Sequence, residues 1–196
     1  LVLTPSGALY GEADAVISAE LRELSAYSTI LAAIARGENK LNDIFHATGF
    51  SRAKISVYLK NLATFNIVEK VVSFETGGWE NTKKGVYQIK DTFVNFWFKF
   101  VYPNMSNLYL LSPEEFYDTY IEKELDAYLE RYFREVCTEY LLILNQMGQL
   151  PFTIKRVGTW IGKTGRIDIV AQSEDRRSII RSEEHTSELQ SLNSIS

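Results

Sequence analysis

Three short helical patterns followed by two β-rich segments constrain the fold more than any other feature of this chain. Apolar residues recur at helical spacing in three successive segments, at 27–34, 41–45 and 55–62. Gly37 follows the first segment as a helix C-terminal signal, and Ser51 stands at the N-cap position of the third. The β-rich segments 67–75 and 85–91 come next, with a polar, glycine-containing loop between them. The sequence therefore predicts three helices and then a β-hairpin.

This order of elements is typical of a winged helix, whose third helix contacts DNA. We therefore expect a winged-helix domain over residues 26–91. The polar side chains expected to face away from its core are Arg52, Lys54, Lys60 and Asn61 on the third helix, with Lys83 and Lys84 at the wing tip. Residues 27–91 contain nine Lys or Arg and six Asp or Glu, although the whole chain has a net charge of −4. These side chains are predicted to contact DNA phosphates. The alternative is an ordinary solvated surface on a module that binds proteins.

An aromatic helix and a long helix are predicted after the hairpin. The aromatic residues at 93–100 keep helical spacing, and we expect them to pack in a core rather than to stack on bases. The long helix is predicted over 112–147, with a break near Glu122. Its predicted apolar stripe is Leu125, Leu129, Tyr132, Phe133, Val136 and Tyr140. Cys137 lies beside that stripe and is interpreted as a packed thiol rather than a nucleophile.

The composition and one glycine motif exclude several kinds of site. One Cys and two His cannot form an internal disulfide or a zinc site of the usual ligand count. The longest apolar run, 93–102, is too short to cross a membrane, so we expect a cytoplasmic protein. The segment GTWIGKT, 158–164, is similar to a phosphate-binding loop but has three residues where that loop needs four, and a strand pattern follows it. It predicts a hairpin turn.

The last segment is predicted to have no structural role. RSEEHTSELQS, 181–191, contains one apolar side chain, Leu189, so it favours neither a strand nor an amphipathic helix. One choice of codons for it resembles the adapter ligated to fragments in short-read DNA sequencing, and residues 192–196 continue that similarity. We therefore interpret 181–196 as an artefactual, disordered tail that packs against nothing. The chain also begins without Met, and we expect it to be a fragment at both ends.

Several segments carry a resemblance to the C-terminal part of a family of archaeal and bacterial P-loop ATPases. They are YSTILAAIARGENKLNDIFHATGFSRAKISVYLKNLATFNIVEK, GVYQIKDTFVNFWFKFVYPN, FREVCTEYL and TWIGKTGRIDIVA. In that family a nucleotide-binding domain precedes a winged helix and a domain of unknown function, number 234 in its series. The resemblance implies that residues 1–25 are the remnant of an ATPase lid or linker. It also implies that the ATP and Mg²⁺ site of the parent protein lies upstream of Leu1, so that this fragment holds no cofactor there.

The last domain of that family is similar to PD-(D/E)xK nucleases, and this implies a second site. Residues 92–180 would then form a truncated, nuclease-like α/β domain. Glu135 would correspond to the helix carboxylate and Asp168 to the strand carboxylate, and together they would bind Mg²⁺ as catalytic residues. The alternative is that Asp168 accepts hydrogen bonds at a strand end. The Glu-x-Lys of the site is expected just after Ile180, where the tail begins, so we expect neither ATPase nor nuclease activity from this fragment.

The sequence thus predicts an α+β chain, with a winged helix-turn-helix domain followed by a truncated nuclease-like domain. The favoured function is that of a C-terminal fragment of a prokaryotic ATP-binding protein, which contacts DNA or protein partners and no membrane. Two alternatives are a winged-helix transcription regulator and a metal-dependent nuclease that acts alone. The oligomeric state is not predicted.

Overall fold

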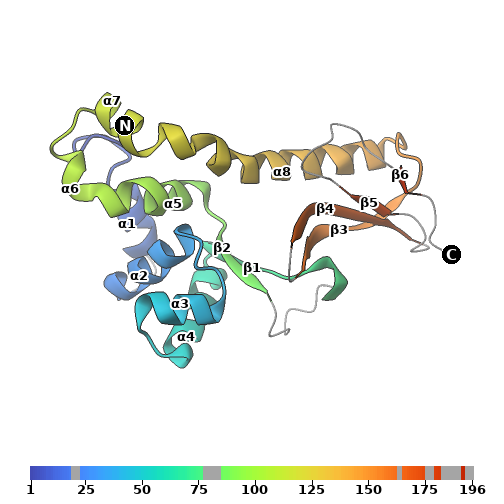
Figure 1. Ribbon diagram of the computed structural model, residues 1–196, viewed down its shortest axis with the longest axis horizontal. Helices are drawn as coiled ribbons and strands as arrows, with labels where there is room; N and C mark the ends of the chain where they lie inside the picture. The colour runs from blue at the N-terminus through green and yellow to red at the C-terminus, as the bar shows by residue number, and fades with distance from the viewer. Residues whose placement is uncertain (19–22, 77–84, 163–164, 175–178, 182–190, 193–196) are drawn as a thin grey trace. The chain divides into compact units, whose positions relative to one another are not determined.

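The computed structural model shows a chain of mixed helices and antiparallel strands, which confirms the α+β class (Figure 1). It describes residues 1–18, 23–76, 85–162, 165–174, 179–181 and 191–192. The chain forms two compact units. Unit 1 comprises Leu1–Val71 and Val86–Leu125, and unit 2 comprises Val72–Gly85 and Asp126–Ser196.

Unit 1 contains the three predicted helices and the predicted strand pair. Its first elements are α1 (Glu12–Ser18), α2 (Leu24–Ala35), α3 (Leu41–Thr48), α4 (Arg52–Thr64), β1 (Val68–Val71) and β2 (Val86–Ile89). The two strands are antiparallel, with Val68 opposite Ile89. The segment 72–75, predicted as part of the first strand, instead leaves the strand and enters a 3₁₀ turn at Phe74–Thr76.

Local signals account for where these helices begin and end. Gly49 ends α3 in the left-handed conformation, with φ of 70°, which glycine adopts without the steric cost of a β-carbon. Ser51 then caps α4 by accepting a hydrogen bond from the backbone N–H of Lys54. The side chains that the three helices bury together include Ile30, Leu31, Ile44, Ile55, Leu59 and Leu62. These are the residues of the helical patterns, so the predicted core of this unit is confirmed.

The aromatic segment lies in the core of unit 1, as predicted. It begins as α5 (Thr92–Phe96), continues as a π-helical turn at Trp97–Val101 and then as a 3₁₀ turn at Tyr102–Asn104. Trp97, Phe98 and Phe100 are buried, which excludes them as an exposed platform for bases. The short helices α6 (Met105–Leu108) and α7 (Pro113–Tyr120) complete this unit.

The long helix has the predicted break, because α7 ends at Tyr120 and α8 spans Glu122–Gln146. In unit 2, the C-terminal part of α8 packs on an antiparallel sheet with the order β3-β4-β5-β6. Its strands are β3 (Ile154–Ile161), β4 (Arg166–Ser173), β5 (Ile179–Arg181) and β6 (Ser191–Leu192). The core between helix and sheet contains Leu141, Ile154, Ile169, Ala171 and Ile180. The pairing of Ile161 with Arg166 confirms the hairpin predicted around GTWIGKT.

Two expectations for unit 2 are wrong. Arg181 belongs to β5, and Ser191–Leu192 pair with β5. Part of the segment 181–196 is therefore paired into the sheet, whereas the whole segment was expected to pack against nothing. Strand pairing satisfies the backbone N–H and C=O groups of a sheet edge, and it therefore needs few apolar side chains. The predicted apolar stripe of the long helix is also largely exposed, because α8 turns a different face, with Cys137 and Leu141, toward the sheet.

Candidate nucleic-acid interface and the Asp168 cluster

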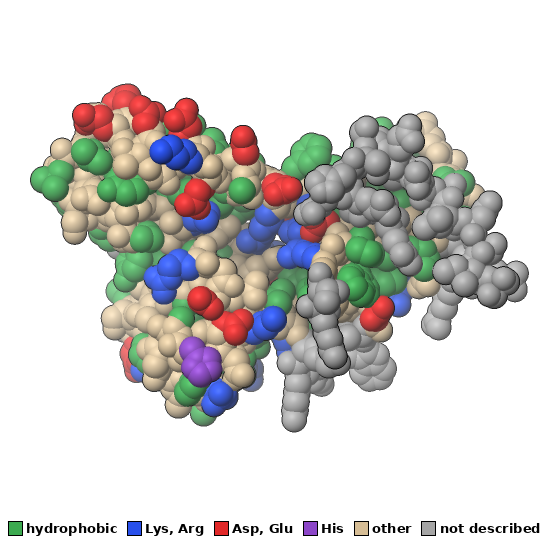
Figure 2. Space-filling model, viewed as in Figure 1, with side chains coloured by type: hydrophobic (Ala, Val, Ile, Leu, Met, Phe, Trp, Pro, Cys, Tyr) green, Lys and Arg blue, Asp and Glu red, His purple; other side chains and the backbone are tan. Residues whose placement is uncertain are grey.

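Arg52 begins α4 and is exposed, as predicted. Its Nε donates to Oδ1 of Asn42 at 3.0 Å, and its guanidinium lies 4.1 Å from the ring centroid of Phe45. Both partners belong to α3, so this neighbouring helix orients the cation by a hydrogen bond and a cation–π contact. Figure 2 shows Lys and Arg atoms beside a His side chain on the surface of this unit. Among the described residues no carboxylate forms an ion pair with Arg52, and its charge is held at the surface.

Lys60 is exposed near the other end of α4, as predicted. Ser56 lies between it and Arg52, and these three residues fall within about a quarter turn of the helix axis. The sequence of α4, RAKISVYLKNLAT, contains three basic residues and no acidic residue. One strip of α4 therefore carries two cations separated by a small hydroxyl side chain.

Lys54 is only partly available for an external ligand. Its Nζ lies 3.9 Å from Oε2 of Glu23 and 4.5 Å from the ring centroid of Phe50. The same carboxylate accepts a hydrogen bond from the hydroxyl of Tyr58. That hydrogen bond, followed by burial of the hydroxyl, raises the pKa of Tyr58 to about 12. Glu23 therefore engages both Lys54 and Tyr58 within unit 1.

Asn61 does not face away from the core as predicted, and its contact with DNA stays a prediction. Its Nδ2 donates to the hydroxyl of Tyr27 at 2.8 Å, and Tyr27 is a buried residue of α2. Asn61 precedes Leu62 on the helix and therefore falls at the edge of the buried face, where it meets α2 instead of solvent. Lys83 and Lys84, predicted at the wing tip, lie outside the described residues.

The segment that follows β1 is fixed to β3 within unit 2. Nη2 of Arg156 donates to the carbonyl of Phe74 at 2.9 Å, and its guanidinium lies 4.5 Å from the Phe74 ring centroid. The backbone N–H of Ile161 donates to Oγ of Ser73 at 3.0 Å. Ser73 and Phe74, predicted at the end of the first wing strand, thus make contacts within the protein that would compete with contacts to DNA.

Asp168, predicted as a metal ligand, forms ion pairs with two arginines. Its Oδ1 lies 2.5 Å from Nη1 of Arg134 on α8 and 2.8 Å from Nε of Arg166 on β4. Burial, and then the neighbouring charge of Arg134, lower the pKa of the Arg166 guanidinium. Asp168 therefore links α8 to β4 through its carboxylate. This fits the alternative interpretation, in which the carboxylate accepts hydrogen bonds.

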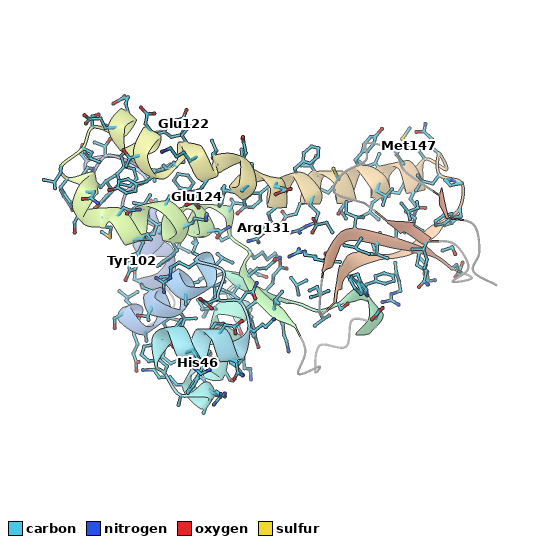
Figure 3. All side chains as sticks on the ribbon, in the orientation of Figure 1. His46, Tyr102, Glu122, Glu124, Arg131 and Met147 are labelled. Atoms are coloured by element: carbon cyan, nitrogen blue, oxygen red, sulfur yellow. The ribbon has the colours of Figure 1, made fainter. Side chains whose placement is uncertain are left out.

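Glu135 has a different partner. Its Oε1 lies 4.0 Å from Nε of Arg131, and just over half of its side chain is exposed. Figure 3 labels Arg131 on the side of α8 where the strands of unit 2 lie. Within the described part of the chain, no group of three or more His, Cys, Asp or Glu is placed to hold a metal ion. These contacts do not fit a Mg²⁺ site, because two guanidinium groups beside Asp168 would repel the cation. The metal site stays an untested prediction.

Sequence reasoning missed both arginine partners of Asp168. Arg166 and Asp168 are two residues apart on one strand, so they share a face, and this spacing could have indicated the pair. Arg134 lies 34 residues from Asp168 in the sequence, and no local pattern connects them.

Part of the chain matches the model of a family of unknown function. Residues 97–193 match the model of a family described as archaeal and bacterial proteins of unknown function, DUF234, and the match extends into the segment interpreted as an adapter. The chain is 33% identical over 165 residues to the uncharacterized protein MJECL04 of Methanocaldococcus jannaschii. That alignment covers 84% of this chain and 36% of the relative, so the chain spans about a third of the relative's length. No solved structure matches the chain. None of the helices in the described ranges has the length and apolar content needed to cross a lipid bilayer.

Proposed function

We propose that this chain is a DNA-binding region of a longer, cytoplasmic, ATP-dependent protein, and that α4 contacts the DNA backbone. The observation that carries the proposal is the exposed strip of α4 with Arg52, Ser56 and Lys60. Three helices followed by an antiparallel strand pair are the framework in which a third helix of this kind enters the major groove.

The spacing of the two cations suits this contact. Arg52 and Lys60 are eight residues apart, which corresponds to about 12 Å along a helix axis. The major groove of B-DNA is about 12 Å wide, so a helix in the groove could direct one cation toward each flanking phosphate strand. The small side chain of Ser56 leaves room for the base edges between them. Because Arg52 is already oriented by Asn42 and Phe45, it loses less side-chain entropy on binding.

A second function, protein binding by the same helix, is favoured by one observation. Val57 is 57% exposed on α4, and an apolar side chain in that position suits a protein surface better than a phosphate backbone. Salt dependence separates the two functions, because phosphate contacts weaken steeply as salt rises.

Binding of the full 196-residue chain to a fluorescent DNA duplex at low salt tests the proposal. The double variant Arg52→Ala with Lys60→Ala should bind roughly tenfold or more weakly, because two phosphate contacts are lost. The matched control is Lys90→Ala with Lys123→Ala, which removes the same charge from exposed positions outside α4 and should bind within about twofold of wild type. Equal weakening of both double variants would indicate nonspecific charge attraction and contradict the proposal.

The ATP-dependent parent is the second part of the proposal, and the resemblance to P-loop ATPases supports it. The complete gene provides the test. A G-x-x-x-x-G-K-[ST] motif in the coding sequence upstream of Leu1 is the expected result. A start codon close to Leu1 would contradict it. We derive no nuclease step, because the described partners of Asp168 are arginines.

A further inference from the structure

Helix α8 has two apolar faces, and the described residues cover only one of them. The inner face carries Cys137 and Leu141 and packs on the sheet of unit 2. The outer face is a row of large apolar side chains, here called the α8 seam. With their exposed fractions, its residues are Leu129 (47%), Phe133 (68%), Val136 (60%), Tyr140 (62%), Ile143 (51%) and Met147 (61%). Met147, labelled in Figure 3, stands one residue beyond the helix end.

The spacing of the α8 seam indicates a helical partner. Successive members are separated alternately by four and three residues, which is the heptad repeat of a coiled coil. The seam contains no charged residue, and its 19-residue span corresponds to about 27 Å along the helix axis. A partner that covers it must therefore offer apolar side chains along a helix of similar length.

The exposed area is sufficient for a stable pair. The exposed fractions correspond to roughly 700 Å² of surface on one copy, so two copies packed seam to seam would bury up to roughly 1,400 Å². Stable protein interfaces bury about 1,200–2,000 Å² in total. An apolar surface of this size is also unusual on a protein that has no partner.

We propose that the α8 seam is a homodimer interface, in which α8 of one copy packs against α8 of a second copy around a two-fold axis. A two-fold interface uses the same patch on both subunits, so the heptad seam supplies its own complement. Among the described helices, α8 has 25 residues and α4, the next longest, has 13. The second copy of α8 is therefore the partner that this chain itself provides with the required length and repeat.

Sedimentation velocity on the full chain, from low to high micromolar concentrations, tests the interface. Wild type is compared with two Val→Glu variants. Wild type should sediment as a dimer that dissociates on dilution. Val136→Glu should be monomeric over the same range, because it places two charges in the apolar seam. The matched control Val57→Glu makes the same substitution at 57% exposure on α4 and should remain dimeric. A monomeric wild type, or a dimer that persists in Val136→Glu, would overturn the proposal.

Cysteine cross-linking tests the same interface with substitutions that are mild enough to preserve the fold. In a Cys137→Ser background, Val136→Cys and Tyr140→Cys are introduced separately and together and then oxidised. At least one of these chains should form a disulfide-linked dimer in high yield, whether the two helices run parallel or antiparallel. Glu135→Cys, about 100° away around the helix, should give at least tenfold less cross-linked dimer. Equal cross-linking of Glu135→Cys, or none from the seam positions, would contradict a paired α8.

Discussion

Helices α4 and α8 carry similar apolar patterns but distribute them differently between core and surface. Helix α4 buries Ile55, Leu59 and Leu62 within unit 1 and exposes a strip with two cations. Helix α8 buries Leu141 against the sheet and leaves the α8 seam exposed. Helical periodicity thus shows which residues share a face, but it does not show which partner covers that face. Because the apolar face of α4 is buried, its polar face is left for binding. The α8 seam is exposed, and in our proposal it is itself the binding surface.

The largest expected effect on stability comes from comparing the same substitution, Leu→Ala, on each of the two helices. Leu59→Ala, at a residue that is 2% exposed, should lower the free energy of unfolding by about 2–5 kcal/mol, because it removes buried contacts and leaves a cavity. Leu129→Ala, at 47% exposure, should cost the monomer less than about 1 kcal/mol. Urea denaturation at low protein concentration measures both. Equal losses would show that α8 buries its seam within one chain.

A smaller effect is expected at the ion pairs that hold the inner face of α8. Asp168→Ala should destabilise the chain by about 1–2 kcal/mol, because it leaves Arg134 and Arg166 close together without their shared carboxylate. Solvent screening keeps the loss of stability this small, since the Asp168 side chain is 32% exposed. The control Glu174→Ala breaks a more exposed pair with Lys155, whose side chains are 62% (Lys155) and 75% (Glu174) exposed, and should cost about 0–0.5 kcal/mol. Thermal melts at matched concentration compare the two. A gain in wild-type stability on adding Mg²⁺ that is absent from Asp168→Ala would contradict a purely structural role for this carboxylate.

The smallest effect concerns the inner face of α4 at high pH. The pKa of Tyr58 is about 12, above its ordinary value of 10.0, because its hydroxyl donates to Glu23. A raised pKa in the folded state means that the stabilising effect of this hydrogen bond is complete below pH 10.0 and is lost as the pH rises toward 12. Burial also raises the pKa of Tyr87. Titration of tyrosinate absorbance should therefore show a late phase that becomes smaller in Tyr58→Phe. The control Tyr109→Phe, at a 66% exposed residue, should leave that phase in place.

The parts of the structure that could be predicted were those that depend on local patterns. Gly37 and Ser51 placed the end of α2 and the start of α4 correctly, because the left-handed conformation and capping depend on neighbouring residues alone. The buried aromatic segment around Trp97 was also predictable, because four large rings at helical spacing, at positions 93, 96, 97 and 100, need a core. The exposure of Arg52 and Lys60 was predictable from the helical spacing of the apolar residues in α4.

Features that depend on tertiary packing were not predictable. Asn61 lies at the edge of the buried face of α4, and its hydrogen bond to Tyr27 depends on where α2 lies. The partner of Asp168 on α8, Arg134, is distant in the sequence. The predicted apolar stripe of α8 includes Phe133, but a second face, with Cys137 and Leu141, packs against the sheet. The strand pairing of Ser191–Leu192 depends on the open edge of β5 rather than on their own side chains.

The salt dependence of DNA binding tests the central claim, that α4 contacts DNA through phosphates, most directly. The logarithm of the binding constant is measured against the logarithm of the salt concentration for wild type and for Arg52→Ala with Lys60→Ala, on the same duplex. We predict linear plots, with the slope of the double variant smaller in magnitude by about 2, one for each phosphate contact removed. Equal slopes for the two proteins, or wild-type binding that does not depend on salt, would contradict the assignment of α4 as the DNA-binding helix.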